Sequence, residues 1–223
     1  MKSIENQPQT PDFTDTGVAF EPKSDAELKQ TAWMFYLMNF RFLVNSMGHL
    51  AIWAVKLRLP FVKTIIKKTL YKQFCGGENL EDAKSTIDHL YSFGVNTMLD
   101  YGAEGKNNEE AFDLVIEENL KSIDFAAQHE SVKVISTKIS GLTRNEVLEK
   151  CQKGMELNDE EESRYKALKH RLHRLCNYAE ERNVGVFVDA EESWIQEAID
   201  GLVLDLMAEY NQGTIIVYNT YQM

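Results

Sequence analysis

Two charged residues, Asp189 and Lys138, each follow a segment that is predicted to be a β-strand. Asp189 ends the stretch 184–189, in which valines alternate with other residues at the period of two that is typical of a strand. Lys138 lies near the end of 132–139, a segment rich in Val, Ile, Ser and Thr. Because ligands of α/β proteins bind at the carboxyl ends of parallel strands, we expect these two side chains to form an ion pair or to clamp a substrate. Asp189 alone is equally compatible with a cap for the helix that follows it.

Other polar residues stand at the remaining strand ends. Gln222 follows the last predicted strand, and its amide can form two hydrogen bonds with a heterocycle. Asp100 ends the first strand, and we interpret it as a carboxylate that caps the strand-to-helix turn. Glu191 and Glu192 come directly after the third strand. We interpret them as acids in the first turn of the next helix, where the helix dipole favours negative charge.

Several common kinds of site are absent from the sequence. It contains no GxGxxG or P-loop pattern, which argues against a Rossmann-type nucleotide site. His170 and His173 are three residues apart on a predicted helix, but no helical glutamate is placed to complete a zinc site, so we interpret them as solvated. No Ser/His/Asp or Cys/His arrangement can be assigned for nucleophilic catalysis.

The overall charge and the cysteines limit the partners and the compartment. The 223 residues carry a formal charge of −11, which argues against nucleic-acid binding. The three cysteines, Cys75, Cys151 and Cys176, are widely spaced with no CxxC pattern, as is typical of a reduced intracellular protein. The polar N-terminus lacks the apolar core of a secretory signal and the Arg-rich character of a mitochondrial one. We therefore expect a cytoplasmic protein, or one at the inner face of the membrane.

Strands and helices alternate from Glu78 onward. The predicted strands cover 95–101, 132–139, 184–189 and 214–218. The predicted helices cover 78–93, 108–129, 144–154, 159–182 and 193–210, and Gly94 is placed to end the first of them. This alternation predicts an α/β fold with four parallel strands and right-handed crossovers. It resembles one side of a (β/α) barrel whose active face lies at the carboxyl ends of the strands.

The N-terminal third is predicted to be helical. We predict three parts in the chain: a flexible tail over 1–22, an N-terminal helical cap over 23–77, and a half barrel over 78–223. Ser24 and Glu27 have the spacing of a capping box at the start of the cap. The stretch 32–55 is very apolar but interrupted by polar residues, which predicts a buried or amphipathic helix pair rather than a membrane span. Pro60 is expected to break this helical region, which resumes over 61–74.

Positive charge is concentrated in the same region. No Asp or Glu occurs between Leu28 and Gly77. Eight basic residues lie there: Lys29, Arg41, Lys56, Arg58, Lys63, Lys67, Lys68 and Lys72. The rest of the chain therefore carries −19, the difference between −11 and +8. A solvated basic face on a helical cap is the simpler interpretation, and peripheral contact of residues 29–72 with a membrane or with an acidic partner is the alternative.

Five segments, in this order along the chain, resemble the proline dehydrogenase family, and most closely its monofunctional bacterial members. They are Phe-Cys-Gly-Gly-Glu at 74–78, Leu-Asp-Tyr-Gly-Ala-Glu-Gly at 99–105, Lys-Ile-Ser-Gly-Leu at 138–142, Val-Asp-Ala-Glu-Glu-Ser-Trp at 188–194 and Tyr-Asn-Thr-Tyr-Gln-Met at 218–223. The resemblance rests on the five together, since no single segment is specific by itself.

The resemblance implies a distorted (β/α)8 barrel that binds FAD without a Rossmann fold. It implies oxidation of L-proline to Δ1-pyrroline-5-carboxylate, with the electrons passed to a membrane quinone. Matching the motifs one residue at a time, Lys138 is expected to contact the substrate carboxylate and Asp189 to order the substrate and the active site. Ala190 and Gln222 are expected to touch the flavin. Glu104 matches a carboxylate at the mouth of the site that pairs with a substrate-binding arginine.

The sequence departs from the family pattern by its length. A (β/α)8 barrel takes ~250 residues, whereas this chain has four predicted strands and devotes its first third to helices. We therefore expect the first half of a barrel, truncated after strand 4, that neither holds FAD tightly nor oxidises proline alone. Two alternatives remain open: a hydroxyproline dehydrogenase, or a non-catalytic half barrel that serves as a binding or assembly module.

Overall fold

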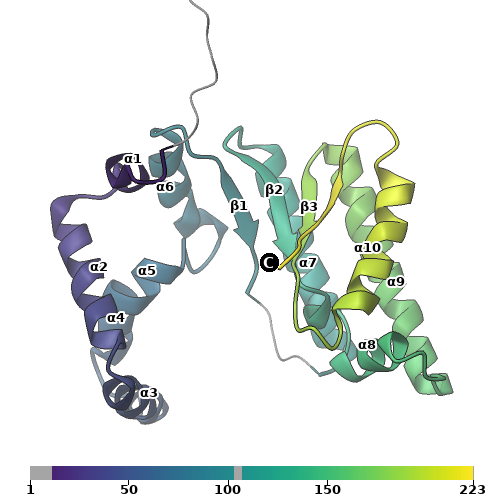
Figure 1. The fold of residues 1–223 in the computed structure, drawn as a ribbon, viewed down its shortest axis with the longest axis horizontal. Coiled ribbons are helices and arrows are strands. Elements are labelled where there is room, and N and C mark those ends of the chain that lie inside the picture. Colours follow the sequence, from purple (N-terminus) through teal and green to yellow (C-terminus); the bar gives the residue numbers. More distant parts are fainter. Residues whose placement is uncertain (1–11, 103–106, 223) are drawn as a thin grey trace, which may run out of the picture. The chain divides into compact units, whose positions relative to one another are not determined.

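The computed structural model describes residues 12–102 and 107–222. The chain forms two compact units, residues 1–89 and 90–223, whose elements are drawn in Figure 1. The sequence placed this boundary after residue 77. The structure groups the next helix with the N-terminal unit, where Thr86 Oγ1 donates to the Gly76 carbonyl at 3.0 Å and the His89 ring lies 2.7 Å from the Pro22 carbonyl.

The described part of the N-terminal unit is built from helices. They are α1 (Thr16–Phe20), α2 (Asp25–Met38), α3 (Arg41–Lys56), α4 (Val62–Ile66), a π-helical turn (Lys67–Tyr71), α5 (Lys72–Phe74) and α6 (Leu80–Tyr91). The predicted capping box opens α2, because the Glu27 amide donates to Ser24 Oγ and the Ser24 amide donates to Glu27 Oε2. Pro60 lies in the break between α3 and α4, as predicted. Helix α1 falls within the segment that the sequence predicted to be a flexible tail.

The N-terminal helices are much less buried than the apolar sequence suggested. Among residues 12–89, the buried apolar side chains are Ala54 and Ile87. Helices α2 and α4 both contact α3, but Phe42 and Trp53 on α3 remain 85% and 64% exposed. The sequence left a buried or an amphipathic helix pair open. The structure has the pair, α2 and α3, but does not bury it, because neighbouring helices cover only part of α3. Among the described helices, none combines the length and the apolar character needed to cross a membrane.

The second unit is an open, fully parallel α/β structure. Its strands are β1 (Thr97–Asp100), β2 (Val132–Thr137), β3 (Gly185–Val188) and β4 (Val217–Asn219), in the order β1-β2-β3-β4. Its helices are α7 (Glu109–Ala127), a 3-10 turn (Ile139–Gly141), α8 (Asn145–Gln152), α9 (Asp159–Arg182) and α10 (Gln196–Tyr210). Sequential strands are also spatial neighbours, as in a (β/α) barrel. The predicted α/β class and the four parallel strands are confirmed, and the sheet is open rather than closed into a barrel.

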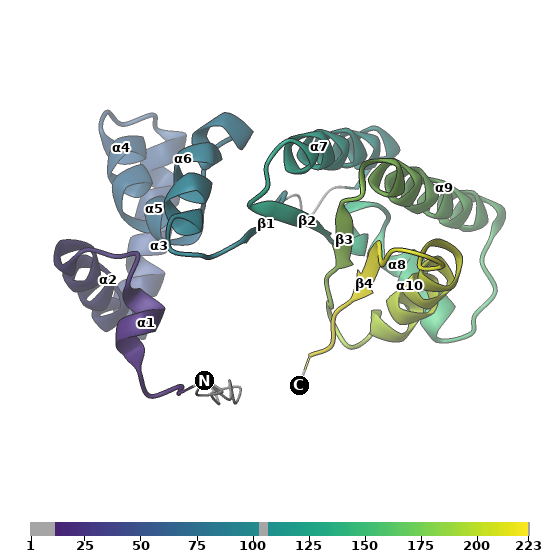
Figure 2. The same ribbon diagram turned by 90° about the horizontal axis from the view of Figure 1, so that it is seen from above.

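The two faces of this sheet have different partners. Figure 2 shows α7, α9 and α10 together on one side of the strands. Side chains of that face form the core: Ile135, Val186, Val188 and Val217 are each at most 1% exposed. The opposite face carries Phe187 and Tyr218, which are paired in the β3–β4 register and stack with centroids 4.5 Å apart.

Gly185 lies on the same face as this aromatic stack. A Cβ atom there would lie 2.7 Å from Val134 Cγ1 and 2.9 Å from Tyr218 Cε2. The glycine in the third strand therefore allows close packing of its two neighbouring strands.

Polar side chains fix how the helices meet the strand ends. Arg171 of α9 is 5% exposed and joins three segments. Its guanidinium donates to Asp113 Oδ1 at 2.8 Å and Glu109 Oε2 at 2.7 Å on α7, and to the Leu142 carbonyl at 3.1 Å after β2. Because a buried guanidinium needs such partners, Arg171 ties α7, α9 and the loop after β2 together.

Capping residues explain two helix boundaries, the end of α6 and the start of α7. Gly94 follows α6 with φ +76°, which confirms its predicted role as a helix end. The N-cap of α7 is Asn108, whose side chain accepts the Ala111 amide at 2.8 Å. The capping role expected of Asp100 at the strand-to-helix turn stays a prediction, because part of that turn lies outside the described residues.

Candidate active site

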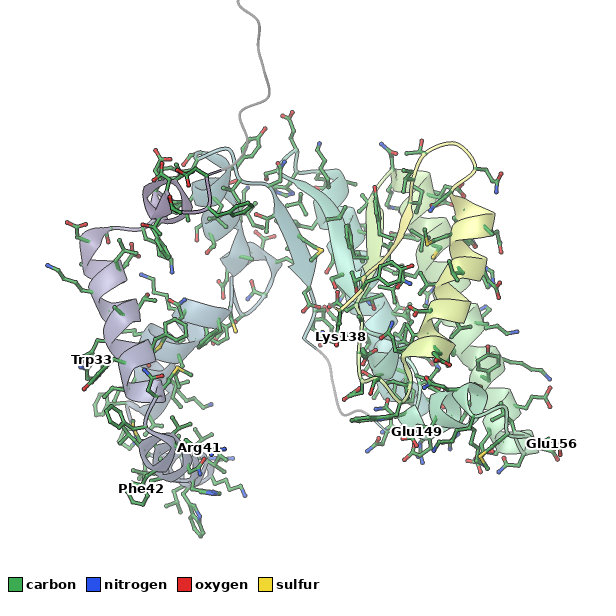
Figure 3. All side chains as sticks on the ribbon, in the orientation of Figure 1. Trp33, Arg41, Phe42, Lys138, Glu149 and Glu156 are labelled. Atoms are coloured by element: carbon green, nitrogen blue, oxygen red, sulfur yellow. The ribbon has the colours of Figure 1, made fainter. Side chains whose placement is uncertain are left out.

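Lys138 and Asp189 form an ion pair at the carboxyl ends of β2 and β3. Lys138 Nζ lies 3.1 Å from Asp189 Oδ2, and the two side chains are 28% and 25% exposed. The strand register explains the contact, because Ser136 pairs with Phe187 and the next residues on the same face are Lys138 and Asp189. The backbone continues the ladder, as the Asp189 amide donates to the Thr137 carbonyl at 3.0 Å. The structure thus brings together the two residues that the sequence singled out first. Figure 3 labels Lys138.

The ion pair belongs to the sheet face opposite α7, α9 and α10. Asp100 pairs with Ser136 in the β1–β2 register, so its side chain shares this face one step below Lys138. Alternation along β4 places Thr220 on the same face as Tyr218. Two carboxylates, one ammonium and one hydroxyl group therefore gather at the carboxyl edge of a single face. Such an edge suits a small substrate that carries both charges.

The loop after β3 is held by residues that follow β4. The Ala190 amide donates to Thr220 Oγ1 at 2.5 Å, and that hydroxyl donates to the Val188 carbonyl at 3.0 Å. Gln222 Nε2 donates to the carbonyls of Ala190 and Glu191 at 3.2 and 3.3 Å. The predicted flavin contacts, Ala190 and Gln222, thus touch each other, and Ala190 directly follows Asp189 in the chain.

Glu191 has a different place from the one expected. Helix α10 begins at Gln196, after a turn at residues 193–195, so Glu191 and Glu192 precede the helix and are not acids of its first turn. Glu191 Oε1 instead accepts the Ser140 amide at 2.9 Å, which links the loop after β3 to the loop after β2. The Glu191 amide donates to Gln196 Oε1 at 2.7 Å. The two loops that carry Lys138 and Asp189 are therefore cross-connected.

A second set of polar contacts supports the loop from the helix side. Gln196 Nε2 donates to Asp200 Oδ1 at 2.9 Å, and Asn219 Nδ2 donates to the same oxygen at 2.8 Å. Sequence reasoning missed Thr220 and this set, and it gave Glu191 a different role. The period of two along β4 was the available signal for Thr220, whereas the contact between Glu191 and Ser140 depends on loop conformation.

Two other groups of predicted residues lie apart from this edge. Glu104 falls outside the described residues. His170 and His173 line a groove on the outer surface of α9 together with Arg174, Asn177, Tyr178 and Glu181. His173 Nδ1 lies 3.1 Å from the Tyr210 hydroxyl, and among the described residues no group of three His, Cys, Asp or Glu side chains is arranged to hold a metal ion. Burial, together with the nearby Glu209 carboxylate, raises the pKa of Tyr210 to about 12.

Comparison with known proteins assigns the family. The family model described as "Proline dehydrogenase" matches residues 83–223. "Proline dehydrogenase 1, mitochondrial" of Dictyostelium discoideum is 27% identical over 94% of this chain and 43% of its own length. The "Probable proline dehydrogenase, mitochondrial" of Schizosaccharomyces pombe is 25% identical over 87% and 49%. "Carbapenem antibiotics biosynthesis protein CarD" of Pectobacterium carotovorum subsp. carotovorum is 36% identical over 67% and 40%.

A solved structure has a similar fold. Proline utilization A (PutA) from Bdellovibrio bacteriovorus, inactivated by N-propargylglycine, matches 71% of this chain and 18% of its own with a TM-score of 0.57 and 17% identity. The chain spans less than half the length of the three curated relatives named above. The family match covers the whole sheet and all of the strand ends described above. The chain belongs to the proline dehydrogenase family.

Proposed function

We propose that this chain supplies the first half of a barrel that oxidises L-proline to Δ1-pyrroline-5-carboxylate with FAD. The observation that carries the proposal is the ion pair between Lys138 and Asp189, at the carboxyl ends of neighbouring strands within the family match. Proline is a zwitterion, and this edge offers groups of both signs to it. Activity then requires the strands that complete the barrel, so the 223-residue chain neither holds FAD tightly nor oxidises proline alone.

Lys138 and Asp189 have complementary parts in this proposal. The Lys138 ammonium binds the carboxylate of proline through a charge-assisted hydrogen bond. Asp189 holds that ammonium at the strand end, 3.1 Å away, and so orients it toward the face of the sheet that carries Phe187 and Tyr218. Glu104 belongs to the same proposal as a carboxylate at the mouth of the site, paired with an arginine from the strands or helices that follow.

The loop after β3 and Gln222 offer hydrogen-bond acceptors to a flavin. The Ala190 amide already donates to Thr220, but its carbonyl has two lone pairs and Gln222 uses one of them. The Gln222 side chain also has an amide oxygen that can accept a hydrogen bond. The residues present therefore offer acceptors that fit the N–H group of an isoalloxazine ring. Bound FAD would supply the acceptor for the hydride that leaves the carbon beside the ring nitrogen of proline.

The electron acceptor and the location extend the proposal. A membrane quinone would take the electrons onward, and residues 29–72 would give the protein peripheral contact with the membrane that contains it. This arrangement corresponds to a cytoplasmic protein at the inner face of the membrane. The exposed aromatic residues and the concentrated positive charge of residues 29–72 support it.

Hydroxyproline is the alternative substrate. "Hydroxyproline dehydrogenase" of Xenopus laevis is 25% identical over 94% of this chain and 52% of its own length. The two substrates differ by one ring hydroxyl group, and residues that contact the ring can come from the part of the barrel outside this chain. A half barrel that only binds or assembles with other proteins is the non-enzymatic alternative.

Flavin spectroscopy tests the proposal. The chain is joined to the later strands of a proline dehydrogenase relative, purified with FAD, and mixed with L-proline or trans-4-hydroxy-L-proline without oxygen. We expect a yellow protein whose flavin absorbance is bleached by proline. Bleaching by hydroxyproline alone would favour the second substrate, and a folded barrel without flavin would favour the binding module. A yellow, proline-oxidising sample of the 223 residues alone would contradict the half-barrel requirement.

A further inference from the structure

The helices of residues 29–72 carry an exposed apolar surface that the site does not use. On α3, Phe42, Leu50 and Trp53 are 85%, 70% and 64% exposed. Spacings of eight and eleven residues place these three side chains on one side of a helix with 3.6 residues per turn. Figure 3 shows Trp33 and Phe42 at the outer side of α2 and α3. The same side of α3 also carries the exposed polar residues Ser46 and His49, and the buried residue of the helix is Ala54.

The neighbouring segments also expose large apolar side chains. Trp33 and Tyr36 of α2 are 65% and 60% exposed, and Phe61 and Ile65 around α4 are 77% and 61% exposed. Large exposed apolar side chains concentrated in one region indicate an interaction site. Tryptophan and tyrosine are enriched where proteins meet the boundary between lipid and water.

The same region, residues 29–72, concentrates positive charge. Two of its eight cations have partners, Lys67 with Glu78 at 2.8 Å and Lys72 with Glu27 at 2.9 Å. The other six form no ion pair among the described residues; they are Lys29, Arg41, Lys56, Arg58, Lys63 and Lys68. This part of the chain therefore has a net positive charge within a protein of −11. It is complementary to an anionic surface and repels a second copy of itself.

We propose that residues 29–72 bind the surface of an anionic lipid bilayer, with α3 lying in the interface and Phe42, Leu50 and Trp53 inserted among the acyl chains. Arg41 and Lys56 at the two ends of α3 contact the lipid phosphates. This proposal deepens the membrane contact of the proposed function and rests on that part of it. It requires neither FAD nor proline, so its failure is distinguishable from failure of the flavin site.

Vesicle flotation tests the electrostatic part. The 223-residue chain is mixed with vesicles of phosphatidylcholine, with or without phosphatidylglycerol, at low salt and at about 1 M NaCl, where the Debye length falls to ~3 Å. We expect binding to anionic vesicles that is lost at high salt. Lys63→Gln with Lys68→Gln should weaken the binding roughly 25-fold, at roughly fivefold for each charge removed. Lys133→Gln with Lys169→Gln, two exposed lysines of the second unit, is the matched control and should leave the binding unchanged.

Tryptophan fluorescence tests the insertion. A variant that retains only Trp53 should shift its emission to shorter wavelength on anionic vesicles and be quenched by brominated acyl chains. A variant that retains only Trp194, which is 54% exposed in the second unit, should do neither. Circular dichroism confirms that both variants are folded.

Three results would overturn the proposal. They are no binding to anionic vesicles at low salt, equal responses of the Trp53-only and Trp194-only variants, and self-association through α3 in place of vesicle binding. Sedimentation equilibrium of the chain and of Phe42→Ser identifies the last result as a concentration-dependent dimer that the substitution abolishes.

Discussion

Replacing Thr220 by valine should loosen the loop that carries the candidate flavin and substrate contacts. The Thr220 hydroxyl accepts the Ala190 amide at 2.5 Å and donates to the Val188 carbonyl at 3.0 Å. Valine has nearly the same shape but no hydroxyl group, so both backbone groups lose a partner. An unsatisfied buried group costs ~1–3 kcal/mol, and partial exposure of this edge places the expected loss in the free energy of unfolding at ~1–2 kcal/mol. Thr220→Ser retains the hydroxyl group and should lose much less.

Two measurements on the 223-residue chain test this expectation. Urea denaturation gives the free energy of unfolding of the parent chain, Thr220→Val and Thr220→Ser. Hydrogen exchange gives the protection of the Ala190 amide, which should fall about tenfold for each 1.4 kcal/mol of local destabilisation in the valine variant. If the valine and serine variants lose equal stability, or if protection of the Ala190 amide is unchanged in Thr220→Val, the assignment of this hydroxyl group as the link between the β3 and β4 ends is wrong.

Further predictions concern packing, the buried guanidinium and pH. Gly185→Ala should lower the free energy of unfolding by ~1–3 kcal/mol, because its Cβ would lie 2.7 Å from Val134 Cγ1. Gly201→Ala, at a helical site with open space, is the control in urea denaturation and should not destabilise the chain. Arg171→Met should cost ~2–3 kcal/mol in the same assay, since it removes charge-assisted hydrogen bonds between α7 and α9; a cost below ~0.5 kcal/mol would refute this role. The Lys72 ammonium, with the Ser24 amide and hydroxyl, lowers the pKa of Glu27 to about 2. As the pH falls, the unfolded chain protonates the Glu27 carboxylate before the folded chain does, so the stabilisation is fully present above pH 4.5 and is lost toward about pH 2. NMR titration of the Glu27 carboxyl carbon measures the pKa in the folded chain, and a midpoint near 4.5 would contradict the contact.

The strands and their shared edge could be predicted because their signals are local. The period of two around Val186 and the glycine after α6 mark elements whose type depends on neighbouring residues in the chain. Once four strands alternate with helices, parallel order follows, and Lys138 and Asp189 must end neighbouring strands. Their contact was therefore predictable without knowledge of side-chain conformation.

The features that the sequence missed depend on tertiary structure. Glu191 was expected in the first turn of a helix. Because of the turn at 193–195, α10 begins only after Glu191, and the Glu191 carboxylate can reach the Ser140 amide. The apolar stretch 32–55 was expected to form a buried or an amphipathic helix pair. Burial needs partner surface, and the described helices around α3 do not provide enough of it. The composition alone does not distinguish a core helix from one that meets a membrane.

The most direct test of the central claim compares two lysines of β2 in a completed barrel. Lys138 ends the strand beside Asp189, and Lys133 is exposed near its start. Flavin bleaching by L-proline, followed by stopped-flow absorbance, should require a much higher proline concentration in Lys138→Met than in the parent. Loss of one hydrogen bond between charged groups predicts a shift of roughly 10- to 100-fold. Lys133→Met should behave as the parent does. Equal proline dependence in the two variants would contradict the assignment of the Lys138–Asp189 edge as the proline site.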